Sequence, residues 1–147
     1  MRTVFAAATM TMAMATAMMA LLPGGPASAT AAPANAYCYI GWPTDGQVVA
    51  AGKPFRVWFG LRHMGVAPKG IAFNNTGHHH LLIDTALPAA GEAIPSNRNH
   101  LHFGAGETET MLELPPGQHT LQLLMGDENH VPHTPPVQSK KITITVR

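Results

Sequence analysis

Histidines are the residues best suited to chemistry in this 147-residue chain, which contains nine of them. Seven fall in three short groups, at residues 78–80, at 100 and 102, and at 130 and 133. Neutral imidazole is a common ligand of transition metals, and it takes up a proton near pH 6.5. Grouped histidines therefore indicate a metal site or acid–base chemistry.

The first group follows a Thr-Gly pair and opens into an apolar run. Successive side chains of a strand point to opposite faces, so His78 and His80 would share one face. His79 would lie on the other face with Leu81 and Ile83. The alternative is that these are hydrogen-bonded polar residues at the start of a strand, without chemistry.

The other two groups have different spacings. His100 and His102 would point to the same side of an extended segment, a spacing that suits two ligands of one metal. His130 and His133 lie in a proline-bearing segment, where fixed φ angles would restrict both rings. There is no H-E-x-x-H motif, so the helical histidine pair of a metalloprotease is excluded.

If the loops of the folded domain bring these rings together, they form a site for copper, zinc or nickel. Carboxylates near the rings would orient them, and we expect Asp84 and Asp127 in this role. The predicted ligands, with the last two as further candidates, are His78, His80, His100, His102, His130, His133, His63 and His79.

The N-terminal residues have the pattern of a secretory leader. Arg2 is followed by an apolar stretch to residue 22, a Pro/Gly break, and two A-x-A signals that end at Ala29 and Ala36. An uncleaved membrane anchor is the alternative. We predict a signal peptide over residues 1–29, cleaved after residue 29 or 36, and a mature periplasmic or secreted domain over 37–147 without an integral membrane segment.

Composition excludes several classes of partner. Without Arg2, the nine basic residues become eight and balance eight acidic ones, so nothing indicates a nucleic acid or an anionic membrane. Six of the nine methionines precede residue 23, which argues against a methionine-rich copper shuttle. Cys38 is the only cysteine, so no intrachain disulfide can form. Its surroundings predict a buried packing role.

Alternating or β-branched segments predict about seven strands in the mature chain, and no segment has helical periodicity. Phe55, Val57, Phe59 and Leu61 would share one face of the clearest strand. The pattern predicts one all-β domain, a single antiparallel β-sandwich of immunoglobulin-like outline. The expected strands cover residues 37–41, 47–51, 55–61, 78–84, 107–114, 119–126 and 140–146, with a loop over 63–70 and a histidine segment over 99–106.

Several phrases, in this order, resemble the exported bacterial family known as domain of unknown function 4399. They are FGL, MGVAP, TGHHHLLID, NHLHFG, PGQHTLQL and the stretch from Gly126 to His133. The resemblance extends over roughly residues 37–147. It departs at His63, where the family usually has glycine, and at Glu107, where it has glutamine. It implies an extracytoplasmic bacterial protein and supplies no function.

The sequence therefore predicts an exported β-sandwich that binds a metal ion, copper or zinc, through loop histidines, for sequestration or delivery. Two alternatives stay open. One is a non-catalytic envelope binding or scaffold module, in which a hydrogen-bonded histidine network only fixes the loops. The other is a metal-dependent enzyme, with histidine and Glu107, Glu109 or Asp127 in acid–base roles. No catalytic residue is assigned, and a protein partner is not predicted.

Overall fold

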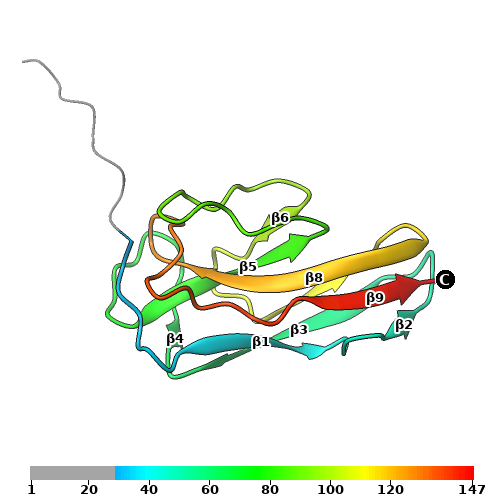
Figure 1. Cartoon of the computed structure of the whole chain (residues 1–147), viewed down its shortest axis with the longest axis horizontal. Coiled ribbons are helices and arrows are strands. Elements are labelled where there is room, and N and C mark those ends of the chain that lie inside the picture. Colours follow the sequence, from blue (N-terminus) through cyan, green and yellow to red (C-terminus); the bar gives the residue numbers. More distant parts are fainter. Residues whose placement is uncertain (1–28) are drawn as a thin grey trace, which may run out of the picture.

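The computed structural model describes residues 29–147, and this part of the chain is built from strands without a helix (Figure 1). The predicted leader lies outside the described residues, apart from Ala29. No helix long and apolar enough to cross a membrane occurs within residues 29–147. The strands are β1 (Tyr37–Trp42), β2 (Val48–Val49), β3 (Phe55–Arg62), β4 (Gly65–Val66), β5 (Thr76–Ile83), β6 (His100–His102), β7 (Glu109–Leu112), β8 (Gly117–Gly126) and β9 (Ile142–Val146).

The strands form two sheets, and Figure 1 shows β1 and β3 in one layer and β5, β8 and β9 in the other. The smaller sheet has the order β1-β3-β7. The larger has the order β2-β9-β8-β5-β4, and β6 also pairs with β5. All pairings are antiparallel except β2–β9 and β4–β5. The predicted antiparallel β-sandwich is confirmed.

The strand count exceeds the prediction because short strands leave little trace in a sequence. β4 has two residues and lies inside the expected loop over 63–70, where it pairs with Thr76 and Gly77. Two residues cannot show the alternation by which strands are recognised. β6 has three residues and occupies the start of the second histidine segment.

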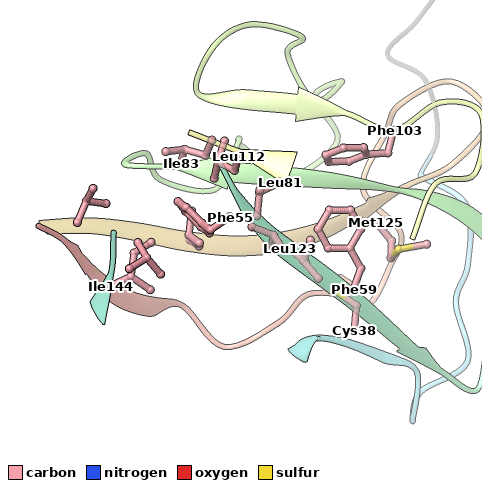
Figure 2. Close-up of a cluster of buried hydrophobic side chains, with 14 of the residues drawn as sticks. Cys38, Phe55, Phe59, Leu81, Ile83, Phe103, Leu112, Leu123, Met125 and Ile144 are labelled. Carbon is pink, nitrogen blue, oxygen red and sulfur yellow. The ribbon is translucent and has the colours of Figure 1, made fainter. Parts of the chain in front are cut away.

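The core lies between the two sheets, as Figure 2 shows. Phe55, Val57 and Phe59 of β3 are buried, while Arg56 and Trp58 between them are exposed. This is the predicted alternation, and it follows from the two-residue period of a strand. The other sheet contributes buried residues of β5, β8 and β9 to the same cluster, among them Leu81, Ile83, Leu121, Leu123, Met125 and Ile144.

Cys38 is part of this core. Its thiol is buried and donates to the Val137 carbonyl, with 3.6 Å between Sγ and the oxygen. Burial raises the pKa of the Cys38 thiol to about 12, so the reactive thiolate is absent at neutral pH. The residue therefore packs as a small apolar side chain and supplies no metal ligand.

Candidate metal centre

The central strand β5 separates the three adjacent histidines as the two-residue period predicts. His79 points into the sandwich, where its ring centroid lies 5.3 Å from that of Phe59. His78 and His80 point to the outer face of the larger sheet, and their ring centroids are 4.8 Å apart. The outer pair is therefore available for a joint site, and His79 belongs to the core.

β6 adds a third ring to the outer pair. The antiparallel register places His102 directly opposite His80, and residues opposite each other in a ladder have side chains on the same face. The ring centroid of His102 lies 5.1 Å from that of His80 and 5.0 Å from that of His78. Hydrogen bonding between β5 and β6 thus brings together histidines that are more than twenty residues apart.

A fourth ring comes from the loop between β8 and β9. The ring centroid of His130 lies 4.7 Å from that of His102, 5.1 Å from that of His78 and 5.9 Å from that of His80. We call His78, His80, His102 and His130 the four-histidine cluster. Its rings come from two strands and one loop, so only the folded chain assembles it.

Three of the four rings have nitrogens at separations that suit one ion, and the fourth ring, that of His130, lies next to one of them. Potential ligand nitrogens of His78, His80 and His102 all lie within 4.8 Å of one another. The Nε2 atoms of His102 and His130 are 3.1 Å apart. Two nitrogens bound to one zinc ion at about 2.1 Å lie roughly 3.4 Å apart in a tetrahedron. The cluster is therefore compact enough to bind a metal after small ring rotations.

The inner half of the cluster is closed to solvent and lacks hydrogen bonds. His78 and His80 are fully buried, and within residues 29–147 neither nitrogen of either ring has a hydrogen-bond partner. A buried polar group without a partner destabilises a fold by about 1–3 kcal/mol. Two such rings side by side indicate a ligand that would occupy the one lone pair that each neutral imidazole offers.

The same burial keeps these imidazoles neutral. Burial, together with the neighbouring histidines, lowers the pKa of His78 to about 4 and that of His80 to about 2. The pKa of His102 is also lowered, by burial and by the charges of His130 and Lys69. A neutral imidazole has a free lone pair, the form that binds metal. At neutral pH no proton has to leave these rings before an ion binds.

Two glycines make room for the rings. A Cβ atom on Gly126 would lie 2.8 Å from Cε1 of His80, and one on Gly104 would lie 2.3 Å from Cε1 of His102. Contacts this short do not occur between real atoms without a shift. The sequence alone does not reveal this role for either glycine. Since a steric role depends on which ring faces the glycine, only the strand pairing reveals it.

Four predicted ligands lie elsewhere. His100 lies opposite Leu82, two residues along β6 from His102. Its Nδ1 lies 3.1 Å from Oδ1 of Asn97. His133 is buried with its Nε2 3.0 Å from the Thr76 carbonyl. The remaining two are His79, in the core, and His63, whose ring lies near Tyr37.

The two predicted orienting carboxylates have different positions. Asp84 is not beside the cluster, because its Oδ2 lies 2.6 Å from Nδ1 of His119, and the Nε2 of His119 lies 2.8 Å from the Pro115 carbonyl. Asp127 stands at the start of the loop that carries His130. Its Oδ1 accepts hydrogen bonds from the amides of Asn129 and Val131, both at 2.9 Å. Asp127 thus fixes the turn around His130.

The buried histidines predict that acid destabilises the metal-free protein. Burial lowers the pKa values of His78 and His79 to about 4 and that of His80 to about 2, against 6.5 in the unfolded chain. Below pH 6.5 the unfolded chain therefore binds more protons than the folded one. Their contribution is complete about one pH unit above 6.5 and is lost as pH falls toward 4, at up to roughly 1.4 kcal/mol per pH unit for each group.

Urea unfolding in the presence of a chelator at pH 7.5, 6.5 and 5.5 measures this effect. We expect the free energy of unfolding to fall by about 1 kcal/mol between pH 7.5 and 6.5, where the unfolded histidines are half protonated, and by about 3 kcal/mol more at pH 5.5, apart from a small term of opposite sign from His119. Burial opposes charge on His119, but hydrogen bonds to Asp84 and the Pro115 carbonyl raise its pKa. A free energy of unfolding that does not fall by pH 5.5 would show that these rings accept protons in the fold.

Comparison with known proteins gives a family and a distant structural neighbour. A family model described as "Domain of unknown function (DUF4399)" matches residues 57–147. The match starts within β3, so β1 and β2 lie outside it, although the sequence resemblance was expected from residue 37. No curated protein matches the chain. The fibronectin(III)-like modules of Clostridium thermocellum CbhA share 12% identity at a TM-score of 0.37, over 74% of this chain and 92% of theirs.

Proposed function

Because this chain belongs to the DUF4399 family, whose description assigns no function, we propose its role from its own site. We propose an exported protein that binds one divalent transition metal ion, copper or zinc, for sequestration or delivery. The ligands are His78, His80, His102 and His130. His100, His133, His63 and His79, which the sequence also nominated, have no part in this site.

The observation that carries the proposal is the set of four buried nitrogens of His78 and His80 without hydrogen bonds. A histidine network that only fixed the loops would have its buried nitrogens paired. His100, His119 and His133 each have such a partner for at least one nitrogen, whereas His79 in the core has none.

What distinguishes His78 and His80 from His79 is that their nitrogens lie within 4.8 Å of those of another histidine, His102. The rings of His78 and His80 lack a hydrogen-bond partner. A bound metal would satisfy the nitrogen that each ring turns toward the centre of the cluster.

The chemistry of the donor set favours a transition metal ion such as copper or zinc over magnesium or calcium. Imidazole suits zinc, copper and nickel, whereas magnesium and calcium require oxygen ligands. The cluster contains no thiolate, since the only cysteine lies in the core. Four protein ligands also complete a tetrahedral site, whereas catalytic zinc keeps an open position. The arrangement therefore favours storage or transfer of the ion over catalysis.

Export is proposed from the leader pattern around Arg2 and the two A-x-A signals. Outside the cytoplasm the protein would meet metal ions as they enter or leave the cell envelope. A site made of imidazole alone suits an oxidising compartment, because it contains no thiol that could form a disulfide. The absence of a thiolate therefore agrees with the proposed location.

Calorimetric titration of tag-free, chelator-treated protein with zinc and with copper tests the proposal. We expect one equivalent per chain, and a stabilisation of about 2.7 kcal/mol when free metal is 100 times the dissociation constant. The His100→Ala variant is the matched control and should bind equally well, since its ring lies outside the cluster. No uptake of metal at micromolar concentration by the wild-type protein, or a loss of binding in His100→Ala, would refute the proposal.

A further inference from the structure

The first described residues lie against the loop that carries His130 (Figure 1). The amide of Ala32 donates to the Thr134 carbonyl, and the amide of Thr134 donates to the Thr30 carbonyl, both at 3.0 Å. Ala32 and Ala36 also pack against the main hydrophobic core. Residues 30–36 therefore form part of the folded domain. The sequence had placed them before its start, at residue 37.

The side chain of Thr30 reaches a buried carboxylate. Its hydroxyl donates to Oδ2 of Asp127 at 2.8 Å, and Asp127 is 1% exposed. The other oxygen, Oδ1, accepts from the amides of Asn129 and Val131. Hydrogen bonds to an ionised carboxylate are among the strongest in proteins. Both oxygens of Asp127 are thus engaged, and Thr30 supplies the contact from outside the loop.

Asp127 in turn determines where His130 lies. The amide of His130 donates to the Asp127 carbonyl at 2.9 Å, and the backbone of His130 has a φ of 66°. A non-glycine residue in this left-handed region is strained and persists only when its surroundings fix it. The hydrogen bonds of Asp127 provide that fixation. Contacts therefore run without interruption from Thr30 through Asp127 to the fourth ring of the cluster.

We infer that a signal peptidase cleaves between Ala29 and Thr30, and that residues 30–36 remain in the mature protein as a strap that positions His130. The inference rests on the proposed export and metal binding. Water hydrolyses the Ala29–Thr30 peptide bond, which leaves a carboxylate on Ala29 and an ammonium group on Thr30. The second A-x-A signal, which ends at Ala36, is not used.

The two cleavage positions have opposite effects on the domain. Cleavage after Ala36 would remove all three hydrogen bonds from residues 30–32 to the loop and would leave Oδ2 of Asp127 without Thr30. Cleavage after Ala29 keeps these contacts. It also places a positive charge on Thr30, the residue whose hydroxyl contacts Asp127. Cleavage after Ala29 therefore keeps every contact by which residues 30–32 hold the loop that carries His130.

Intact-mass analysis of protein exported from the full chain tests the cleavage position. We expect a mature protein that begins at Thr30. A mature protein that begins at Tyr37, or a chain that keeps its leader, would overturn the inferred cleavage. This measurement needs no metal, so it is independent of the proposed binding site.

The Thr30→Val variant of the exported protein tests the strap, because valine keeps the shape and lacks the hydroxyl. In metal-free protein we expect hydrogen exchange at the amides of Asn129 and Val131 to rise roughly tenfold, and zinc affinity to fall by a similar factor. The matched control is Thr110→Val, whose exposed hydroxyl donates to the adjacent Met111 carbonyl; it should change neither the exchange rates nor the zinc affinity.

The two readouts separate the two proposals. Unchanged exchange at Asn129 and Val131 in Thr30→Val would overturn the strap, even if the wild-type protein binds zinc. Faster exchange in a protein that binds no zinc would support the strap and refute the metal site. Unchanged zinc affinity together with faster exchange would show that the strap does not position His130, and would overturn the inference.

Discussion

Replacing His80 with leucine is expected to abolish metal binding while the metal-free protein stays at least as stable. Loss of a direct ligand should weaken zinc binding by more than about 100-fold, since even partners of metal ligands are worth about 10–100-fold. His80 is buried and neither of its nitrogens has a partner. Leucine removes this unfavourable burial of about 1–3 kcal/mol and packs apolar atoms in its place. Calorimetry and urea unfolding measure the two effects.

His119→Leu is the control, and it should behave in the opposite way. This variant leaves the Asp84 carboxylate without its imidazole partner, which lies 2.6 Å away. We expect a loss of about 1–2 kcal/mol in the free energy of unfolding at pH 6 and no change in zinc affinity. A His80→Leu protein that unfolds more easily by several kcal/mol and still binds zinc would contradict our interpretation of the cluster.

A single methyl group on Gly104 is expected to weaken metal binding while the fold is almost unchanged. The Cβ atom of Gly104→Ala would lie 2.3 Å from Cε1 and 2.6 Å from Nε2 of His102. His102 is partly exposed and can rotate into solvent, so the fold should lose less than about 1 kcal/mol. A ligand moved by an ångström or more no longer reaches the ion, and we expect zinc affinity to fall at least about tenfold.

Gly65→Ala is the matched control for this substitution. Its Cβ would approach only Cγ2 of Thr76, at 3.2 Å, and the carbonyl of Asn75, at 3.9 Å. We expect its zinc affinity to equal that of the wild-type protein. Equal zinc affinities for Gly104→Ala and Gly65→Ala would show that His102 does not need the free space beside Gly104 in order to bind the metal.

The fold could be predicted because the information is local. Alternating apolar residues in β3, with Phe55 and Phe59 inside and Trp58 outside, define a two-sided strand from the sequence alone. The same period placed His78 and His80 on one face and His79 on the other. Which face is the core depends on the opposite sheet, and the sequence does not show it.

The choice among the remaining histidines could not be predicted because it depends on contacts between distant segments. His100 and His102 have equal claims in the sequence, and only the register of β6 against β5 places His102 opposite His80. His130 and His133 likewise have equal claims. The turn fixed by Asp127 directs His130 to the cluster, whereas His133 bonds to the Thr76 carbonyl. Spacing along the chain does not encode either result.

The most direct test of the metal centre is X-ray absorption spectroscopy at the zinc edge on protein loaded with one equivalent of zinc. We predict a first shell of four nitrogen atoms at about 2.0 Å, with the multiple scattering of imidazole rings, and a reduced imidazole count in His130→Ala. A first shell of oxygen atoms, or a spectrum that His130→Ala leaves unchanged, would contradict the assignment of the ion to the four-histidine cluster.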